Sequence, residues 1–307
     1  MTQEWHPQPG VDARSPRPEA EPPRGVRREG SRNLPLDSHL HTALSPDSDV
    51  PIDVYAAQAV ERGIREIAIT DHVDFDPRGA AYAYASFETR EREAREAAER
   101  WADKGVDIRF GTEITYDRDF EADIRQHLAE HTYDFVIGSV HVGVDSPYRE
   151  ERVASFVAGK TMAEIVAPYF HEVVDAARSG LFDTIGHIDF IKRYVHPHRT
   201  AADFAGIPEL YEPILKALVE TETALEVNTS GLRQSPAETY PAEPIVERFR
   251  ALGGRHVTAG SDAHRADAFA FGLEDGYRVA AGAGFRELLF RRGGSRLAVQ
   301  LPDRLGT

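Results

Sequence analysis

The sequence predicts a β/α barrel with seven parallel strands. Short apolar runs alternate with helical segments along most of the 307-residue chain, and such alternation is typical of parallel βαβ units. A single series of these units, about 270 residues long, favours a TIM-like barrel. An open, doubly wound sheet is the alternative architecture for the same order of elements.

Seven apolar runs have the length and composition expected of buried strands. They lie at 34–42, 65–72, 106–116, 133–142, 182–191, 223–230 and 255–264. Helical segments follow them, at 54–63 and 87–105 and near 120–130, 161–179, 208–222 and 241–252. A last strand-like piece, RELLFRR at 286–292, is expected to close or cap the barrel.

The first 33 residues are expected to be a disordered tail. They are rich in Pro, Gly, Arg and Glu and contain almost no residues that could form a core, which is the composition of chains that do not fold. The barrel domain is therefore expected to span residues 34–307.

The charge of the chain restricts its partners. It has 36 Lys and Arg against 51 Asp and Glu, a formal net charge of −15. Because the tail holds six Arg and five acids, the remainder carries −16. Such a body repels a polyanion, which argues against extended DNA or RNA as the main partner. A small phosphorylated substrate is compatible with this charge, since bound divalent metals can make a site locally positive.

The expected location is the cytoplasm. The chain contains no Cys, so disulfides and thiolate metal sites are both excluded. No stretch approaches the ~20 apolar residues that span a bilayer, and the N-terminus lacks the apolar core of a signal peptide. These features predict a soluble protein with no membrane partner, and they leave the oligomeric state open.

Metal-binding side chains stand at the ends of six of the seven predicted strands. In β/α barrels the active site lies at the C-terminal ends of the strands, so these side chains are expected to converge. They are His39 and His41 on the first run, His72, Glu113, His141 and His187 on the next four, and Asp262 and His264 on the seventh.

The local spacing supports metal binding. Side chains two apart on a strand point to the same face. HLH at 39–41 therefore presents two imidazoles together, and DAH at 262–264 presents a carboxylate and an imidazole. Such ligands suit Zn, Mn and Fe, and the two oxygens of Glu113 could bridge two ions.

Other histidines and acids are interpreted as structural or supporting groups. A lone histidine is more often hydrogen-bonded than a ligand, and this applies to His127, His131, His171, His196, His198 and His256. Asp71 faces away from the neighbouring His72 and is expected to support the site. Asp37 and Asp189 share the faces of His39 and His187 and could touch the site.

The order of the motifs DSHLHT, TDH, GTEI, GSVH, GHID and GSDAH resembles the polymerase-and-histidinol-phosphatase (PHP) family. The tract HTALSPDS resembles its monofunctional histidinol-phosphatase branch, as do NTSGLR and GHIDFIKRY. The resemblance runs from about residue 36 to residue 272 and covers nearly all of the predicted barrel.

The resemblance implies a distorted seven-stranded barrel with three divalent metal ions, Zn, Mn or Fe. It divides the ligands by position into a first set of His39, His41, Glu113 and Asp262, a second of Glu113, His141 and His187, and a third of His72 and His264 with Asp47 nearby. Many family members have a histidine at the position of Asp47, whereas the histidinol-phosphatase branch shares the aspartate. Because Glu113 counts twice, the nine side chains offer ten contacts to metal. Three ions need roughly 12–18 such contacts, so a bridging hydroxide and substrate oxygens would complete the coordination.

The implied reaction is the hydrolysis of a small phosphate monoester, with L-histidinol phosphate as the leading substrate. Metal ions a few Å apart activate a bridging water and hold the attacking and leaving oxygens. Glu113, Asp262 and His264 are the predicted catalytic residues, and either Asp262 or His264 could deliver the proton to the leaving oxygen.

Two arginines are the predicted phosphate ligands, because a guanidinium matches phosphate geometry better than an ammonium does. They are Arg193 and Arg233, which follow strand ends; Lys160 and Lys192 are weaker candidates. Two alternatives stay open at this point. One is a PHP phosphoesterase that acts on nucleotides or oligonucleotide ends, and the other is a non-catalytic metal-binding domain.

Overall fold

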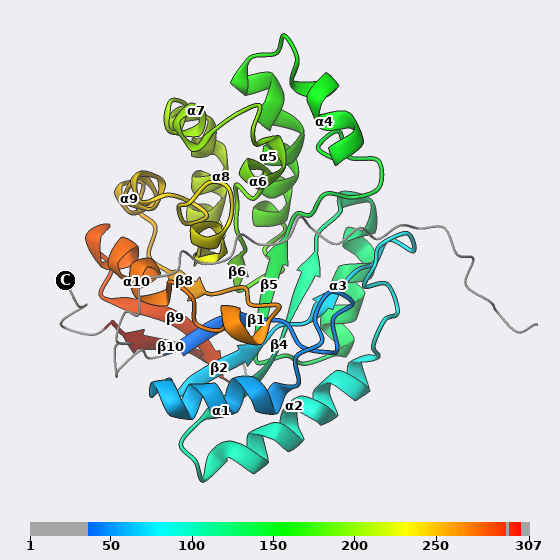
Figure 1. Cartoon of the computed structure of the whole chain (residues 1–307), viewed down its shortest axis with the longest axis vertical. Helices are drawn as coiled ribbons and strands as arrows, with labels where there is room; N and C mark the ends of the chain where they lie inside the picture. Colours follow the sequence, from blue (N-terminus) through cyan, green and yellow to red (C-terminus); the bar gives the residue numbers. More distant parts are fainter. Residues whose placement is uncertain (1–35, 293–294, 302–307) are drawn as a thin grey trace, which may run out of the picture.

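Seven parallel strands form the centre of the molecule (Figure 1). The structure is a computed structural model that describes residues 36–292 and 295–301; the predicted disordered tail at 1–33 lies outside these residues. The strand order is β1-β2-β4-β5-β6-β7-β8, and a short strand, β3, pairs with β4. The bounds are β1 Leu36–Leu40, β2 Glu66–Ile69, β3 His72–Val73, β4 Asp107–Thr115, β5 Phe135–Ser139, β6 Thr184–Ile185, β7 Ala224–Asn228 and β8 Val257–Gly260.

The first and last strands meet at their C-terminal ends and nearly close the barrel. Leu40 pairs with Ala263 in a parallel bridge. The amide of His41 donates to the carbonyl of Ala263 (2.9 Å), and the amide of Asp262 donates to the carbonyl of His39 (2.8 Å). All neighbouring strands along the path are parallel. The predicted seven-stranded barrel is therefore confirmed, and the open doubly wound sheet is excluded.

Helices follow the strands and surround the barrel (Figure 1). They are α1 Ile52–Arg62, α2 Phe87–Ala102, α3 Glu121–Glu130, α4 Glu150–Val157, α5 Met162–Ser179, α6 Ile191–Val195, α7 Ala201–Ala205, α8 Pro208–Glu220, α9 Glu243–Ala251 and α10 Leu273–Gly282, with short 3-10 turns at η1 Arg118–Phe120, η2 Ser230–Arg233 and η3 Ala266–Ala268. The longest, α5, starts with a capping box in which the side chains of Thr161 and Glu164 satisfy each other's backbone amides. It ends at Gly180, whose φ of 64° suits the left-handed cap.

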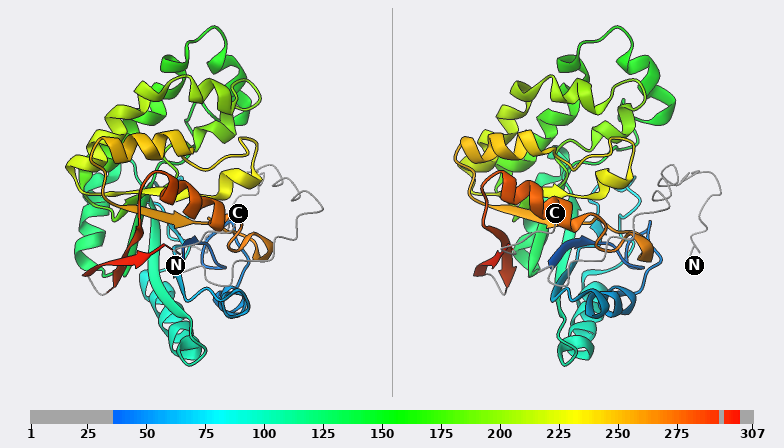
Figure 2. Two further views of the ribbon diagram at one scale, coloured as in Figure 1. Left: turned by 90° about the vertical axis from the view of Figure 1, so that its left-hand side faces the viewer. Right: turned by 60° about the vertical axis from the view of Figure 1, so that its left-hand side comes forward.

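The strand predicted at 286–292 is present but does not close the barrel. It is β9 (Glu287–Arg292), and it pairs antiparallel with β10 (Ser295–Gln300) in a separate two-stranded sheet. Figure 2 shows this hairpin in red, beside the barrel. The backbone of Asp262 and Ala263, just after β8, bonds to the end of β1 in place of β9, so the expectation that this strand closes the barrel is wrong. Leu288 of β9 is buried against the core, which is compatible with the expected capping role.

In the part of the chain that the structure describes, no helix combines the length and apolar character needed to cross a bilayer.

His127 on α3 packs in an aromatic cluster away from the strand ends, as predicted for a structural histidine. Its ring contacts those of Phe75, Phe87 and Tyr133, and its Nε2 lies 2.8 Å from the Tyr133 hydroxyl. Burial lowers the pKa of His127 to about 4, with smaller contributions from the positive charges of His131 and Arg90.

This low pKa predicts a pH-dependent contribution to stability. Unfolded histidine has a pKa of about 6.5, so between about pH 6.5 and pH 4 the unfolded chain binds a proton that the folded chain does not, and stability falls as the pH falls. His127→Gln removes this difference. Urea unfolding at pH 7 and pH 5 should show a smaller loss of stability for His127→Gln than for the parent. The control His171→Gln, at an exposed position, should lose as much as the parent; equal losses in all three proteins would contradict the assignment.

Candidate metal centre

Four side chains from β1, β4 and the end of β8 place their ligand atoms around one point. Nε2 of His39 lies 3.1 Å from Nε2 of His41. Both nitrogens are 3.3 Å from Oε2 of Glu113, and they are 3.7 and 3.4 Å from Oδ1 of Asp262. Four ligand atoms at tetrahedral positions ~2.1 Å from a zinc ion lie about 3.4 Å from one another. The ligand atoms of His39, His41 and Glu113 therefore lie close enough together to share one metal ion, and Oδ1 of Asp262, the fourth member predicted for this set, lies beside both imidazoles.

Glu113 connects this set to a second one. Its other oxygen, Oε1, lies 2.9 Å from Nε2 of His187 and 3.4 Å from Nε2 of His141. Oε2 also lies 3.0 Å from Nδ1 of His72. The carboxylate is fully buried, and its two oxygens face two groups of imidazoles. This arrangement is what a carboxylate that bridges two ions requires.

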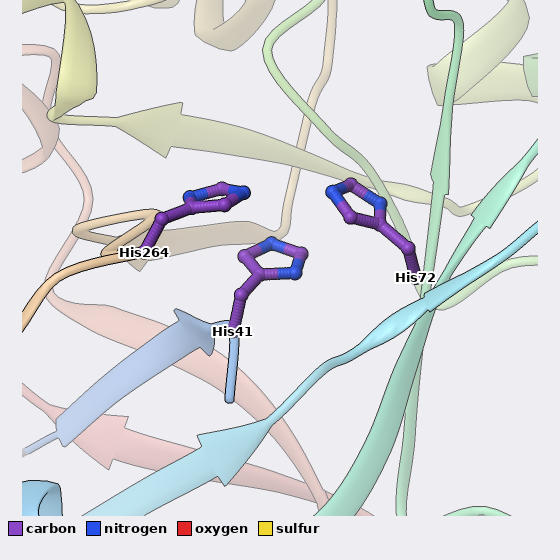
Figure 3. Close-up of side chains that lie close together, drawn as sticks. All are labelled: His41, His72 and His264. Carbon is purple, nitrogen blue, oxygen red and sulfur yellow. The ribbon is translucent and has the colours of Figure 1, made fainter. Parts of the chain in front are cut away.

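Three imidazoles form the outer part of the cluster. His41, His72 and His264 project toward one another from the end of β1, from β3 and from the segment after β8 (Figure 3). Their ligand nitrogens form one of the groups that could hold a metal ion. Oδ2 of Asp47 lies 3.4 Å from Nε2 of His72 and 3.2 Å from Nε2 of His264. The structure thus brings all nine predicted ligands together, with Asp47 as the most exposed of them.

Ligand nitrogens of His41 and His72 belong to more than one group. His41 stands with His39 and Glu113 in one group and with His72 and His264 in another, and His72 also stands with Glu113 and His141. The predicted division among three ions is therefore one of several that this geometry permits. Among the described residues, none of the six histidines interpreted as structural belongs to these groups.

The electrostatics of the cluster match a site for cations. Although burial opposes it, the imidazoles of His39, His72 and His141 hold the pKa of Glu113 well below its usual range. His39 and His41 do the same for the pKa of Asp262. Burial and the neighbouring His264 and His72 lower the pKa of His41, which favours the neutral imidazole that a metal ion needs. Although burial opposes it, the carboxylates raise the pKa values of His39 and His72, so the cluster attracts positive charge, as a cation site does.

The acids next to the ligand histidines support the barrel instead of facing the ligand atoms. Asp37 accepts hydrogen bonds from the amide and hydroxyl of Ser261 (2.8 and 2.6 Å), and burial raises the pKa of Asp37 to about 6. Asp71 accepts from the amide of Thr42 (2.6 Å) and the hydroxyl of Ser45 (2.9 Å), in the supporting role predicted for it.

Asp189 lies in a buried ion pair behind the cluster. Its Oδ2 is 2.6 Å from Nζ of Lys192 and accepts from the Tyr211 hydroxyl at 2.8 Å. Lys192 also bonds to Glu238 at 2.6 Å. The expectation that Asp37 and Asp189 could touch the site has no support from these contacts, because each carboxylate is bound to another element.

The two predicted phosphate ligands have different surroundings. The guanidinium of Arg193 lies 5.6 Å from the ring centroid of Phe190, and that ring packs against His187, so Phe190 links Arg193 to the cluster. Arg233 is buried, and its terminal nitrogens donate to the carbonyls of Ser261 and Asp262, both at 2.7 Å. These bonds hold the segment that carries Asp262. Lys160, a weaker candidate, lies over the ring of Phe156.

Two of the predicted ligand residues have unusual backbone conformations. Asp262 has a φ of 54° and His187 a φ of 24°, a region that residues other than glycine seldom adopt. Such conformations persist only where surrounding contacts hold them. Arg233 supplies such contacts at Asp262, and Glu226 supplies one at His187, since its Oε2 accepts from the His187 amide at 2.9 Å.

Glu226 is a buried acid of the centre that sequence reasoning missed. It lies on β7, the predicted strand that offered no ligand, and it is fully buried. The only signal in the sequence was a charged residue inside the apolar run ALEVN.

Comparison with known proteins gives consistent matches. The PHP domain family model matches residues 37–230. The histidinol-phosphatase of Lactococcus lactis subsp. lactis is 30% identical over 254 residues, which cover 82% of this chain and 93% of the relative. The probable histidinol-phosphatase of Deinococcus radiodurans is 32% identical over 263 residues, 83% of this chain and 96% of the relative.

A solved structure shares the fold over nearly its whole length. The crystal structure of histidinol phosphate phosphatase from Lactococcus lactis, complexed with Zn, L-histidinol and phosphate, superimposes with a TM-score of 0.75 and 27% sequence identity. The match covers 86% of this chain and 98% of that chain.

Proposed function

Since this chain belongs to the PHP domain family, we propose that it is a metal-dependent phosphatase that hydrolyses L-histidinol phosphate to L-histidinol and phosphate. The observation that carries the proposal is the group of donor atoms from His39, His41 and Glu113 at the barrel mouth, 3.1 to 3.3 Å apart, with Oδ1 of Asp262 within 3.7 Å of both imidazoles. The substrate follows from the relatives named above and from the solved structure that contains L-histidinol and phosphate. This reaction would belong to histidine biosynthesis, and a cytoplasmic location stays a prediction.

We propose three ions per chain, each held by one predicted ligand set. Glu113 would bridge the first two ions, and Asp47 would join His72 and His264 at the third. Zinc is the first choice, because the similar solved structure contains it; Mn and Fe suit the same ligands. When bound, the ions would supply Lewis acidity and a water molecule activated near neutral pH.

The chain's own residues would orient the substrate and move its protons. Glu113, Asp262 and His264 are the proposed catalytic residues. Asp262 or His264, both members of the cluster, would pass a proton toward the leaving oxygen. Arg193, beside His187 and Phe190, would bind the phosphoryl oxygens. Arg233 would add positive charge beneath Asp262 while it holds that segment in place.

Replacing Arg193 with methionine is expected to lower kcat/KM about 10- to 100-fold, since a hydrogen bond to a charged group contributes roughly 1.5–3 kcal/mol. The loss should appear mainly in KM if the guanidinium binds substrate and transition state equally. Steady-state kinetics with L-histidinol phosphate measure both constants. The exposed Arg92 on α2 is the control, and Arg92→Met should match the parent. Unchanged kinetics in Arg193→Met would remove Arg193 from the proposal.

The substrate proposal is tested by phosphate release from a panel of monoesters. Zinc-loaded protein would be given L-histidinol phosphate, p-nitrophenyl phosphate, a nucleoside monophosphate and a short oligonucleotide. We expect the highest kcat/KM with L-histidinol phosphate. Faster hydrolysis of the nucleotide or oligonucleotide would instead support the phosphoesterase alternative, and inactivity toward all four would support a non-catalytic domain.

A further inference from the structure

Glu226 is a buried carboxylate whose hydrogen bonds all lead to the metal centre. It has no exposed surface and lies on β7, between the strands that carry His187 and Asp262. Its Oε1 is 2.6 Å from Nδ1 of His39. Its Oε2 accepts from the amide of His187 at 2.9 Å and from Nδ2 of Asn228 at 3.0 Å.

We propose that Glu226 is a positioning residue that fixes His39 for metal binding and aligns two further ligand residues with it. This inference rests on the proposed metal centre and goes beyond it, because Glu226 is not one of the nine proposed ligands.

The contact with Glu226 sets the tautomer of His39. An ionised carboxylate only accepts hydrogen bonds, so Nδ1 of His39 must carry the proton that it donates to Oε1. The nitrogen left for a metal ion is then Nε2, which is the atom that faces His41, Glu113 and Asp262. A carboxylate behind a ligand histidine fixes the ring and raises its basicity.

The second oxygen extends this control to two other ligands. The bond from the His187 amide holds that residue at its φ of 24°. Asn228, which donates to Oε2 of Glu226, also donates to Oδ2 of Asp262 at 3.2 Å. Glu226 is therefore linked to residues of both ligand sets that share Glu113, although β7 itself supplies no proposed ligand.

Two glycines leave the room that the Glu226–His39 pair occupies. A Cβ at Gly260 would lie 2.3 Å from Cβ of His39 and 3.2 Å from Oε1 of Glu226. A Cβ at Gly186 would lie 3.3 Å from Oε2 of Glu226. The neighbouring strands β8 and the end of β6 thus carry glycine where a side chain would press on the carboxylate.

The test is the zinc affinity of Glu226→Gln, measured by competition with a chromophoric chelator. A glutamine side chain has one accepting oxygen and one donating NH2 group, so it cannot satisfy both sides of this site. If the NH2 group faces His39, it opposes the proton on Nδ1. If it faces His187, it opposes the His187 amide and the NH2 group of Asn228. Changes behind a ligand histidine typically cost 10- to 100-fold in metal affinity or activity, so we expect the affinity for zinc to fall about 10- to 100-fold. Excess zinc should restore most of kcat with KM unchanged, because Glu226 does not touch the substrate.

Asp183→Asn is the matched control. Asp183 is also a buried carboxylate that accepts a backbone amide, that of Val136 at 3.0 Å, but it precedes β6 at the end of the barrel away from the cluster. We expect Asp183→Asn to bind zinc as the parent does. Equal weakening in both variants would show a general effect of lost buried charge and would overturn the proposal.

A second variant covers the case in which Glu226→Gln does not fold. Glu226→Asp keeps the charge and withdraws the carboxylate from His39 by one methylene, so it should fold and bind zinc more weakly than the parent. Parental zinc affinity in a folded variant, Gln or Asp, would overturn the positioning role. If zinc binding weakens as expected but the parent does not hydrolyse L-histidinol phosphate, the proposed substrate fails and the positioning role stands.

Discussion

Glu113→Gln is expected to abolish phosphate release and to lower the metal content of the purified protein. Glu113 is fully buried, and its two oxygens face His39, His41 and His72 on one side and His141 and His187 on the other. Removing one partner of a buried charged pair costs about 3–5 kcal/mol, which corresponds to roughly 10²- to 10⁴-fold in affinity. Because Glu113 contacts both ligand sets, the substitution should weaken the binding of both proposed ions.

The measurements are kcat/KM for L-histidinol phosphate and zinc per chain by elemental analysis. Asp134→Asn is the control on the neighbouring strand, since Asp134 accepts the Phe110 amide at 3.0 Å and lies at the start of β5, away from the cluster. It should keep both metal and activity. A Glu113→Gln protein that retains the parental zinc content would contradict the bridging role, whatever its activity.

Chelation of the metal is expected to remove activity completely and to lower the thermal midpoint by about 10 °C. An ion bound 1,000-fold above its Kd stabilises the folded state by about 4 kcal/mol, and 1 kcal/mol moves the midpoint of a large domain by about 2–4 °C. The physical reason is the burial of Glu113 and Asp262, whose negative charges then have only imidazoles to balance them.

Differential scanning calorimetry before and after chelation measures this shift, and restored zinc should return both the midpoint and the activity. Glu113→Gln, which lacks the bridge, should show a smaller shift on chelation than the parent. An unchanged midpoint together with unchanged activity in metal-free protein would exclude a metal-dependent phosphatase.

The barrel and the convergence of the proposed ligand side chains were predictable because both depend on local pattern. Apolar runs marked the seven barrel strands, and six of these runs ended on His, Asp or Glu. Strand ends meet at one edge in any β/α barrel, so residues as distant as His39 and Asp262 could be placed together without knowing the packing. The structure brings Oδ1 of Asp262 within 3.7 Å of Nε2 of His39.

Other features depend on contacts across the fold and could not be read from spacing. Glu226 acts on His39, 187 residues away in the chain, and a lone Glu in an apolar strand does not reveal its partner. Arg233 follows a predicted strand end in the segment NTSGLR, a position expected of a phosphate ligand. Its bonds to the backbone carbonyls of Ser261 and Asp262 appear only in the structure.

Short elements were missed for a different reason. The helices α6 and α7 have five residues each, fewer than two turns, and so show no helical periodicity. The two-residue strand β3 carries His72 opposite Glu113, and a run of this length has no alternation to detect. β9 pairs with β10 and not with a barrel strand because the segment after β8 bonds to β1. That closure is a property of the whole barrel and cannot be read from residues 286–292.

The most direct test of the metal centre is a crystal structure of the zinc-loaded protein with anomalous diffraction data collected at the zinc edge. We expect one anomalous peak among Nε2 of His39, Nε2 of His41, Oε2 of Glu113 and Oδ1 of Asp262, and a second peak on the other side of the Glu113 carboxylate. We also expect that Nδ1 of His39 still bonds to Glu226. The absence of a peak at the first position, or a single ion that Glu113 does not contact, would contradict the proposed metal centre.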